Sequence, residues 1–164
     1  MTEPFGKYLR LRVEGASRSP DISCVLTGFP AGVPAPKEEL QAFLARRAPG
    51  QNPWSTARRE PDVPEIVSGV TDGVTDGNPI EIRIPNTDAE KTDAVDYAVT
   101  PRPSHADFAA VQKYGNAVDL RGGGHFSGRL TAPFCAAGFF ALQYLQMRGI
   151  EVFAHLFSVG SVKD

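Results

Sequence analysis

The stretch Arg121-Gly122-Gly123-Gly124-His125-Phe126-Ser127-Gly128-Arg129, which we call the glycine turn, joins a polar segment to the longest apolar segment of the chain, residues 130–147. Consecutive glycines can adopt positive φ and let a backbone approach a ligand, because no Cβ stands in the way. A helix that begins near Ser127 would point its free N–H groups back into this turn, where they could bind an anion. Arginines flank the turn on both sides. The stretch therefore predicts an anionic ligand, although a flexible linker would also explain a glycine run.

The composition fits one domain of a soluble protein, with 164 residues, 41% hydrophobic residues and a net charge of −2. No segment is strongly basic throughout, which argues against a nucleic-acid partner. The cations are twelve arginines and only five lysines, and eight of the arginines lie between Arg46 and Arg129. Because a guanidinium group can bind phosphate or carboxylate through two parallel hydrogen bonds, the sequence favours a small, multiply anionic ligand over a polymer.

Two cysteines, Cys24 and Cys135, lie in apolar runs, and we interpret both as reduced core residues. Neither has histidine or cysteine at metal-ligand spacing, so no metal site is expected. The first residues show no apolar core of a signal peptide. Pro133 and Gly138 interrupt the apolar segment, which argues against a membrane span. We therefore expect a cytoplasmic protein.

Hydrophobic periodicity predicts an α+β fold, with helices packed against an antiparallel sheet. Strands are expected at residues 8–14, 22–27, 65–70, 80–84 and 150–157, with a hairpin turn at 69–77. Helices are expected at residues 37–47, 104–114 and 127–148, and a long loop at 86–103. The last helix should turn one stripe to the core, formed by Leu130, Phe134, Ala137, Ala141 and Leu145.

One histidine and one group of arginines are candidates for chemistry. Ser104 is expected to cap the helix at 104–114, with Phe108 and Val111 facing the core and His105 in its first turn. The positive helix end disfavours a charged imidazole there unless an anion lies nearby, so His105 suits proton transfer beside a phosphate. A surface or capping histidine remains the alternative. The group of Arg46, Arg47, Arg58 and Arg59 is interpreted as either an anion site or a solvated surface.

Several ordered stretches of the chain together resemble chorismate synthase. They are residues 44–51 (LARRAPGQ), 55–62 (STARREPD), 65–70 (EIVSGV), 86–88 (NTD), 102–107 (RPSHAD), 113–115 (KYG) and the glycine turn itself. The resemblance implies a lyase that eliminates phosphate from 5-enolpyruvylshikimate 3-phosphate to give chorismate, in the shikimate pathway of aromatic amino acid biosynthesis. It also implies reduced FMN as cofactor, with NADPH as a candidate reductant. The implied fold is a β-α-α-β sandwich with helices between two antiparallel sheets, in a homotetramer.

The resemblance also assigns site residues by position. His105 matches the histidine on the flavin side of proton transfer. The implied flavin contacts are Gly124, His125, Phe126 and Ser127, and the implied substrate-binding residues are Ser17, Arg47 and Arg129. The second catalytic histidine of the family is replaced by Arg18, which can neutralise a phosphate but is a poor proton donor because its pKa is too high.

Other departures concern single positions and length. Ala48 replaces a family arginine, and His125 with Phe126 replaces the commoner Arg-Ser pair. We treat residues 1–164 as one domain that resembles roughly the N-terminal half of the family, so a second half or a homo-oligomer is expected to complete the site. The alternatives are a truncated, non-catalytic relative that binds an anion or acts as a scaffold, and a plain interaction domain without a ligand.

Overall fold

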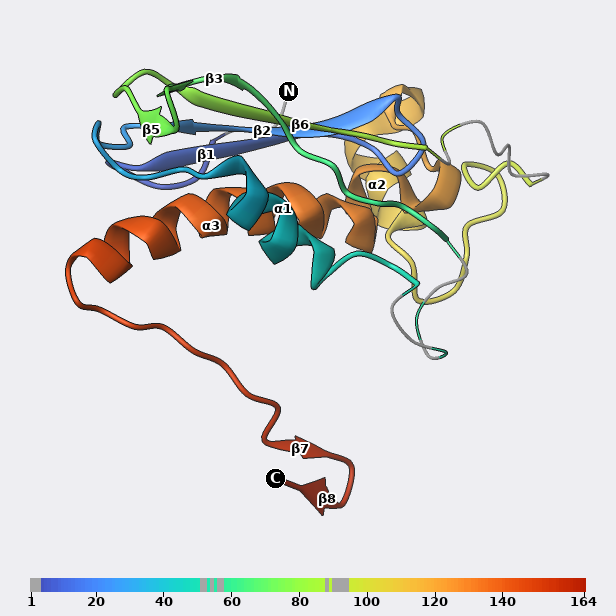
Figure 1. Cartoon of the computed structure of the whole chain (residues 1–164). Coiled ribbons are helices and arrows are strands. Elements are labelled where there is room, and N and C mark those ends of the chain that lie inside the picture. The colour runs from blue at the N-terminus through green and yellow to red at the C-terminus, as the bar shows by residue number, and fades with distance from the viewer. Residues whose placement is uncertain (1–3, 51–52, 54, 56–57, 88, 90–94) are drawn as a thin grey trace.

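The computed structural model describes residues 4–50, 53, 55, 58–87, 89 and 95–164. Its centre is a four-stranded antiparallel sheet with the strand order β1-β2-β6-β3 (Figure 1). Strands β1 (Arg10–Gly15) and β2 (Asp21–Thr27) form a hairpin, and β6 (Ile80–Pro85) lies between β2 and β3 (Glu65–Ser68). The predicted antiparallel α+β architecture is therefore confirmed.

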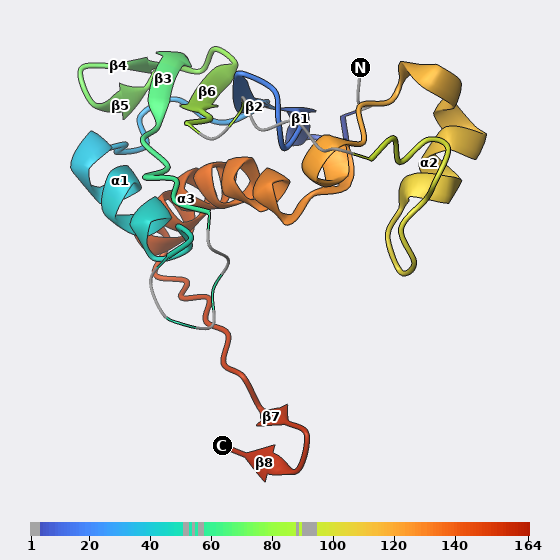
Figure 2. The same cartoon turned by 90° about the vertical axis from the view of Figure 1, so that its right-hand side faces the viewer.

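Alternation along the central strands separates a core face from a polar face. On β2 the side chains of Ile22, Cys24 and Leu26 are buried, and on β6 the three isoleucines are buried in the same way. Helices α1 (Lys37–Ala45) and α3 (Thr131–Met147) cover this face and lie side by side beneath the sheet (Figures 1 and 2). Fully burying one such side chain contributes about 1.5–3 kcal/mol, so this layer contact defines the core.

Helix α3 differs from its prediction at its start and in its buried face. It begins at Thr131, because two short 3₁₀ turns, η2 (Arg121–Phe126) and η3 (Gly128–Leu130), precede it. Phe134 is 45% exposed and stacks on Phe5, so the predicted stripe is wrong at that position. The buried residues of α3 are Ala132, Pro133, Ala136, Ala137, Phe139 and Phe140. A helix that is apolar all round has no periodicity strong enough to select one side.

Helix α2 spans Asp107–Tyr114, so the predicted start at Ser104 is wrong. Ser104 has a φ of 63°, no side chain caps the helix, and His105 precedes the first turn instead of lying in it. Phe108 is 64% exposed, against the prediction that it faces the core. The buried face of α2 carries Asp107 and Ala110, because the Asp107 carboxylate is turned inward by a partner described below.

The connections follow the predictions more closely. Strands β4 (Val70–Thr71) and β5 (Val74–Thr75) form the expected hairpin within 69–77. Between residues 86 and 103, the part that the structure describes contains no helix or strand, as expected, whereas positions 88 and 90–94 lie outside the described residues.

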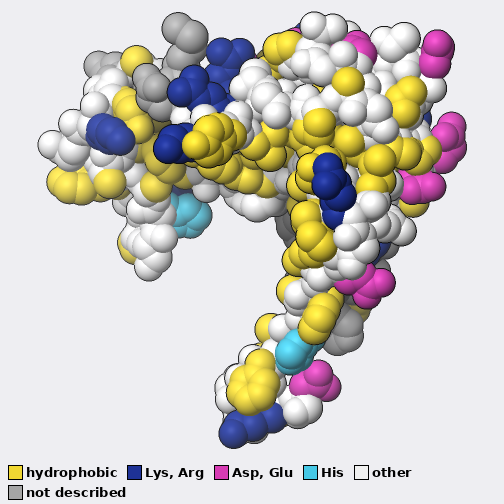
Figure 3. Space-filling model, turned by 90° about the vertical axis from the view of Figure 1, so that its left-hand side faces the viewer, with side chains coloured by type: hydrophobic (Ala, Val, Ile, Leu, Met, Phe, Trp, Pro, Cys, Tyr) yellow, Lys and Arg dark blue, Asp and Glu magenta, His cyan; other side chains and the backbone are white. Residues whose placement is uncertain are grey.

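The last 17 residues project away from the body of the molecule (Figure 1). They end in a small hairpin of β7 (Ser158–Val159) and β8 (Val162–Lys163), and the strand predicted at 150–157 is not formed. Hydrophobic side chains continue from the body onto this projection (Figure 3). A strand needs a neighbour to bond its backbone, and residues 150–157 have no ladder partner within the described part of the chain. No helix among the described residues is long and apolar enough to cross a membrane.

Candidate anion-binding site

Two arginines converge on the buried carboxylate of Asp62. Arg129 Nη1 donates to Oδ1, and Arg47 Nη1 donates to Oδ2 at 2.6 Å. Arg129 is 5% exposed and Asp62 is fully buried, so the pair lies in a low-dielectric environment. Arg129 Nε donates to Asn86 Oδ1 at 2.8 Å, whereas its Nη2 is buried and has no hydrogen-bond partner among the described residues. A buried guanidinium donor without a partner is costly, and an anionic oxygen would satisfy it.

A second buried pair lies next to the first. Arg58 donates through Nε and Nη2 to Glu60 Oε1 at 2.9 and 2.7 Å, and Thr87 donates to Oε2 through both its backbone N–H and its hydroxyl. Burial raises the pKa of Glu60, but the hydrogen bonds from Thr87 and Arg58 outweigh it and hold the pKa below its ordinary value. Arg58 Nη1 also donates to Ser17 Oγ at 2.9 Å, which attaches the predicted substrate-binding serine to this pair.

The glycine turn packs against the loop that follows β1. Ser17 N donates to Gly124 O at 2.9 Å, and His125 Nδ1 lies 3.0 Å from Gly15 O. Because a carbonyl oxygen only accepts, Nδ1 of His125 carries the hydrogen in this contact. The structure thus brings Ser17 next to Gly124 and His125, which lie more than a hundred residues further along the chain.

The glycines of the turn are required by the protein's own atoms. A Cβ at Gly122 would lie 2.7 Å from Ser17 Oγ and 3.2 Å from Arg18 Nε, and a Cβ at Gly124 would overlap the carbonyl oxygen of Asp119. All three glycines, 122 to 124, have positive φ. The side chains of Ser17 and Arg18, the carbonyl oxygen of Asp119 and the positive φ angles therefore explain the glycine run without invoking a linker.

Arginines from separate segments form what we call the cluster. The guanidinium groups of Arg47, Arg58 and Arg129 bind the carboxylates of Glu60 and Asp62, and the guanidinium group of Arg18 lies beside Gly122. Two members of the predicted arginine group do not join it: Arg46 lies over the ring of Phe43, and Arg59 is exposed. Guanidinium groups gathered in this way match a phosphate or carboxylate group, which they can bind through charge-assisted hydrogen bonds.

His105 lies outside this cluster, on the turn that precedes α2. Arg102 closes the turn by donating through Nε and Nη2 to the Asp107 carboxylate at 2.7 and 2.8 Å. These hydrogen bonds lower the pKa of Asp107 to about 2. Arg102 Nη2 also donates to Leu120 O, directly before the glycine turn. His105 is exposed, and no hydrogen bond or ion pair within the described residues joins it to the cluster.

The remaining predicted flavin contacts are on the exposed side of the glycine turn. Phe126 is 47% exposed and its ring centroid lies 6.4 Å from that of Tyr114, which is also about half exposed. Ser127 Oγ accepts a hydrogen bond from Arg129 N at 3.2 Å, so it caps η3 and helps to fix the direction of Arg129. Two half-exposed aromatic rings form a surface on which a flat ligand can lie.

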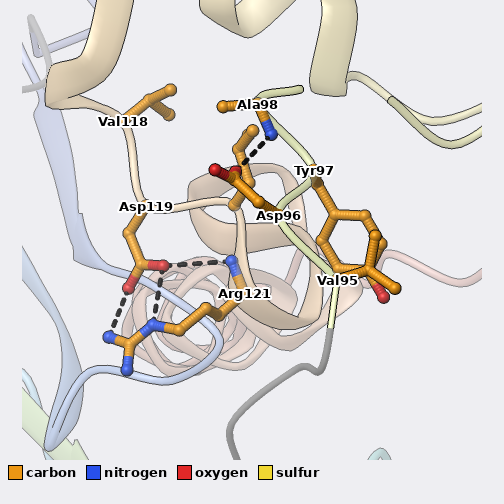
Figure 4. A pocket seen from close by; sticks show the side chains of 8 residues that line it. Val95, Asp96, Tyr97, Ala98, Val118, Asp119 and Arg121 are labelled. Atoms are coloured by element: carbon orange, nitrogen blue, oxygen red, sulfur yellow. Dashed lines mark hydrogen bonds and ion pairs between the residues drawn. The ribbon is translucent and has the colours of Figure 1, made fainter. Parts of the chain in front are cut away.

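A pocket of about 460 Å³ adjoins the start of the glycine turn (Figure 4). It is lined by residues 95–98 and 118–121. Arg121, expected to flank the anion, instead donates to Asp119 through Nε and Nη2, and these bonds lower the pKa of Asp119. Asp96 accepts from the backbone N–H of Ala98. None of the residues assigned to the site by the sequence lines this pocket.

Sequence reasoning missed the residues that hold the arginines. Glu60, Asp62 and Asn86 accept hydrogen bonds from the arginines, and Thr87 donates to Glu60, but the sequence shows these four residues only as parts of matching stretches. The pattern Arg-Arg-Glu-Pro-Asp at 58–62 carried a signal, since acids beside a run of arginines are natural counter-ions.

The fold and this cluster define an α+β protein with a candidate anion site, in which arginines from separate segments converge beside a glycine turn. The family model described as chorismate synthase matches residues 9–164. The chain belongs to the chorismate synthase family, as its resemblance predicted.

Individual relatives agree with the family assignment. The chain is 43% identical to a chorismate synthase of Lancefieldella parvula over 165 residues, which cover 100% of this chain and 43% of that protein. It is 45% identical to one of Burkholderia mallei over 160 residues, which cover 97% of this chain and 43% of that protein. A structure titled "Crystal Structure of Chorismate Synthase" is similar with a TM-score of 0.70 and 29% identity, covering 96% of this chain and 39% of that chain. The chain thus spans less than half the length of the relatives it matches.

Proposed function

We propose that this chain supplies the phosphate-binding part of a chorismate synthase, a carbon–oxygen lyase that eliminates phosphate from 5-enolpyruvylshikimate 3-phosphate to give chorismate. The observation that carries the proposal is the buried Nη2 of Arg129, which has no hydrogen-bond partner among the described residues and lies within a cluster of arginines. The non-catalytic alternative is not favoured, because the family model matches residues 9–164 and the relatives cover nearly the whole chain.

The arginines would stabilise the leaving group. Charge accumulates on the phosphate as its carbon–oxygen bond breaks, so donors already fixed in place lower the barrier without reorganising. Arg129 and Arg47 would bind the anion together with Ser17, and each charge-assisted hydrogen bond is worth about 1.5–3 kcal/mol. Arg18 lies beside Gly122 and would neutralise the phosphate without donating a proton.

Reduced FMN is the proposed cofactor, and the chain's residues fit it. The half-exposed rings of Phe126 and Tyr114 offer a surface for a flat ring system, and Gly124, His125 and Ser127 lie on the same turn. When bound, the reduced flavin would supply electron density transiently in a reaction without net redox change. His105 would hold and move a proton on the flavin side, at a position exposed to a bound ligand. NADPH is the proposed reductant.

Assembly and compartment follow the same proposal. Residues 1–164 would act as one domain in the cytoplasm, completed by a homotetramer or by a C-terminal half, with no nucleic-acid or membrane partner. The projecting residues 148–164, whose apolar side chains are exposed, agree with packing against such a complement.

An anaerobic assay tests the proposal. The chain would be incubated with reduced FMN and 5-enolpyruvylshikimate 3-phosphate, alone and with the separately produced C-terminal part of the Lancefieldella relative, and chorismate would be measured by chromatography. We expect product in the complemented mixture and its loss in Arg129→Ala, whereas Arg83→Ala, at an exposed arginine of β6, should retain it. Absence of chorismate in both mixtures would overturn the lyase proposal.

A further inference from the structure

We propose that Asn86 is the positioning residue of the anion site. Its side-chain amide fixes Arg129 with one end and the loop that carries Ser17 and Arg18 with the other. The inference rests on the proposed function, since it concerns the same site, but it assigns a role to a residue that the sequence shows only as part of the matching stretch 86–88.

Both ends of the Asn86 amide are occupied. Its Oδ1 accepts from Arg129 Nε at 2.8 Å, and its Nδ2 donates to Ser19 O at 2.7 Å and to Ala16 O at 3.3 Å. A guanidinium group only donates and a carbonyl oxygen only accepts, so the partners themselves determine which end is oxygen and which is nitrogen. Asn86 therefore has one orientation in the site, and that orientation joins two segments more than a hundred residues apart.

The sheet determines where this amide lies. Asn86 directly follows β6, whose last residue, Pro85, pairs with Asp21 at the start of β2. The backbone N–H of Asn86 continues this ladder by donating to Pro20 O at 2.8 Å. Because the pairing of β6 with β2 sets this register, the sheet determines where the amide lies.

The next residue ties in the second ion pair. Thr87 donates through its backbone and its hydroxyl to Glu60, which holds Arg58 on Ser17. Asn86 and Thr87 thus connect both buried pairs to one point at the end of β6. Asn86 binds Nε of Arg129 and Asp62 binds its Nη1, so the plane of the guanidinium group is fixed and Nη2 points in a single direction. The ligand class that matches is an oxyanion such as a phosphate group.

Anion titration of Asn86 variants tests this role. Inorganic sulfate and inorganic phosphate would be titrated into the full chain by calorimetry, at a temperature where every variant is folded. We expect Asn86→Ala to weaken binding about tenfold or more, because Arg129 loses a charge-assisted bond that orients it. Asn86→Asp keeps the shape and the acceptor, but it loses the two hydrogen bonds that Nδ2 donates and its charge would repel an added anion, so it should bind more weakly still. Asn78→Ala, at an exposed asparagine just before β6, is the matched control and should change little.

A spectroscopic readout separates positioning from general stabilisation. The ¹⁵N–¹H signal of Arg129 Nε is assigned with Arg129→Lys. In the parent protein its chemical shift should differ from that of a free arginine and its hydrogen should exchange slowly with solvent, and both features should be lost in Asn86→Ala. If Asn86→Ala does not fold, Asn86→Asp, which preserves side-chain volume, carries the titration. Unchanged affinity in both variants together with an unchanged Nε signal would overturn the role of Asn86 and leave the proposed function intact. Failure of the parent chain to bind sulfate, phosphate or the proposed substrate would instead overturn the anion site itself.

Discussion

Arg129 and Asp62 form an ion pair that solvent hardly reaches, with side chains 3% and 0% exposed. They are 67 residues apart in the chain, and each has further partners: Asp62 also accepts from Arg47, and Arg129 also donates to Asn86. Burying both charges costs free energy that their attraction must offset, so the pair adds little net stability by itself. Removing one partner, however, would leave a buried charge without compensation.

Asp62→Ala should therefore lower the free energy of unfolding by about 3–5 kcal/mol, because Arg129 would keep its charge without its counter-ion. Urea denaturation measures this change. Asp72→Asn serves as control, since Asp72 lies in an exposed turn with a φ of 51° that asparagine tolerates. A loss as small as that of the control would contradict the importance of the pair. Added sulfate should stabilise Asp62→Ala more than the parent chain, because an anion can replace the lost carboxylate.

Asp107→Asn should destabilise the fold in a pH-dependent way. Arg102 lowers the pKa of Asp107 from 3.8 to about 2, so the ion pair contributes stability that is present above about pH 4 and is lost as the pH falls through about 2. The difference in unfolding free energy between parent and variant should be about 1–3 kcal/mol at neutral pH and should shrink towards zero in acid. Chemical denaturation over this pH range measures the difference, with Glu38→Gln at an exposed position of α1 as control. A difference that stays constant with pH would argue against the Arg102 pairing.

Gly124→Ala should be strongly destabilising, because the new Cβ would overlap Asp119 O and because the backbone there has a φ of 55° and a ψ of −132°. The backbone strain alone costs about 1–3 kcal/mol. Gly138→Ala is the opposite case, since nothing lies within 4 Å of a Cβ there and the residue is in the middle of α3. That variant should gain roughly 0.5–1 kcal/mol. Thermal melting of the two variants side by side tests the contrast, and equal melting temperatures would refute it.

The two thiols should differ in reactivity. Burial raises the pKa of Cys24 to about 12, whereas Cys135 is partly exposed on α3. Since the thiolate is the nucleophile, iodoacetamide at mildly alkaline pH should label Cys135 in the native protein and Cys24 only after unfolding. Mass spectrometry of the labelled peptides distinguishes them. If Cys24 in the native protein were labelled as fast as Cys135, the result would show that the sheet opens under native conditions.

Predictions from periodicity succeeded where burial is one-sided. On β2 and β6 buried side chains alternate with more exposed ones, and both strands are predicted to within about one residue of their observed bounds, β6 from its alternation and β2 from a more continuously apolar run. Helix α3 is apolar all round, so its pattern gave its existence but not its buried side, and Phe134 was assigned wrongly. At 150–157 the alternation of apolar and polar residues predicts a strand that is not formed, because a strand forms only where another segment accepts its hydrogen bonds.

The amino-acid sequence by itself determined the family of this protein, its α+β class and the residues proposed for the site, among them Ser17, Arg47 and Arg129. These depend on local order and spacing, which a linear pattern preserves. The tertiary structure alone decided which acceptors hold the arginines: Asp62, Glu60 and Asn86 acquire their roles through partners many residues away. It also decided that glycines 122 and 124 accommodate the protein's own Ser17 and Asp119. The physical reason is that a buried charge is stable only beside its partner, and folding of the chain selects that partner.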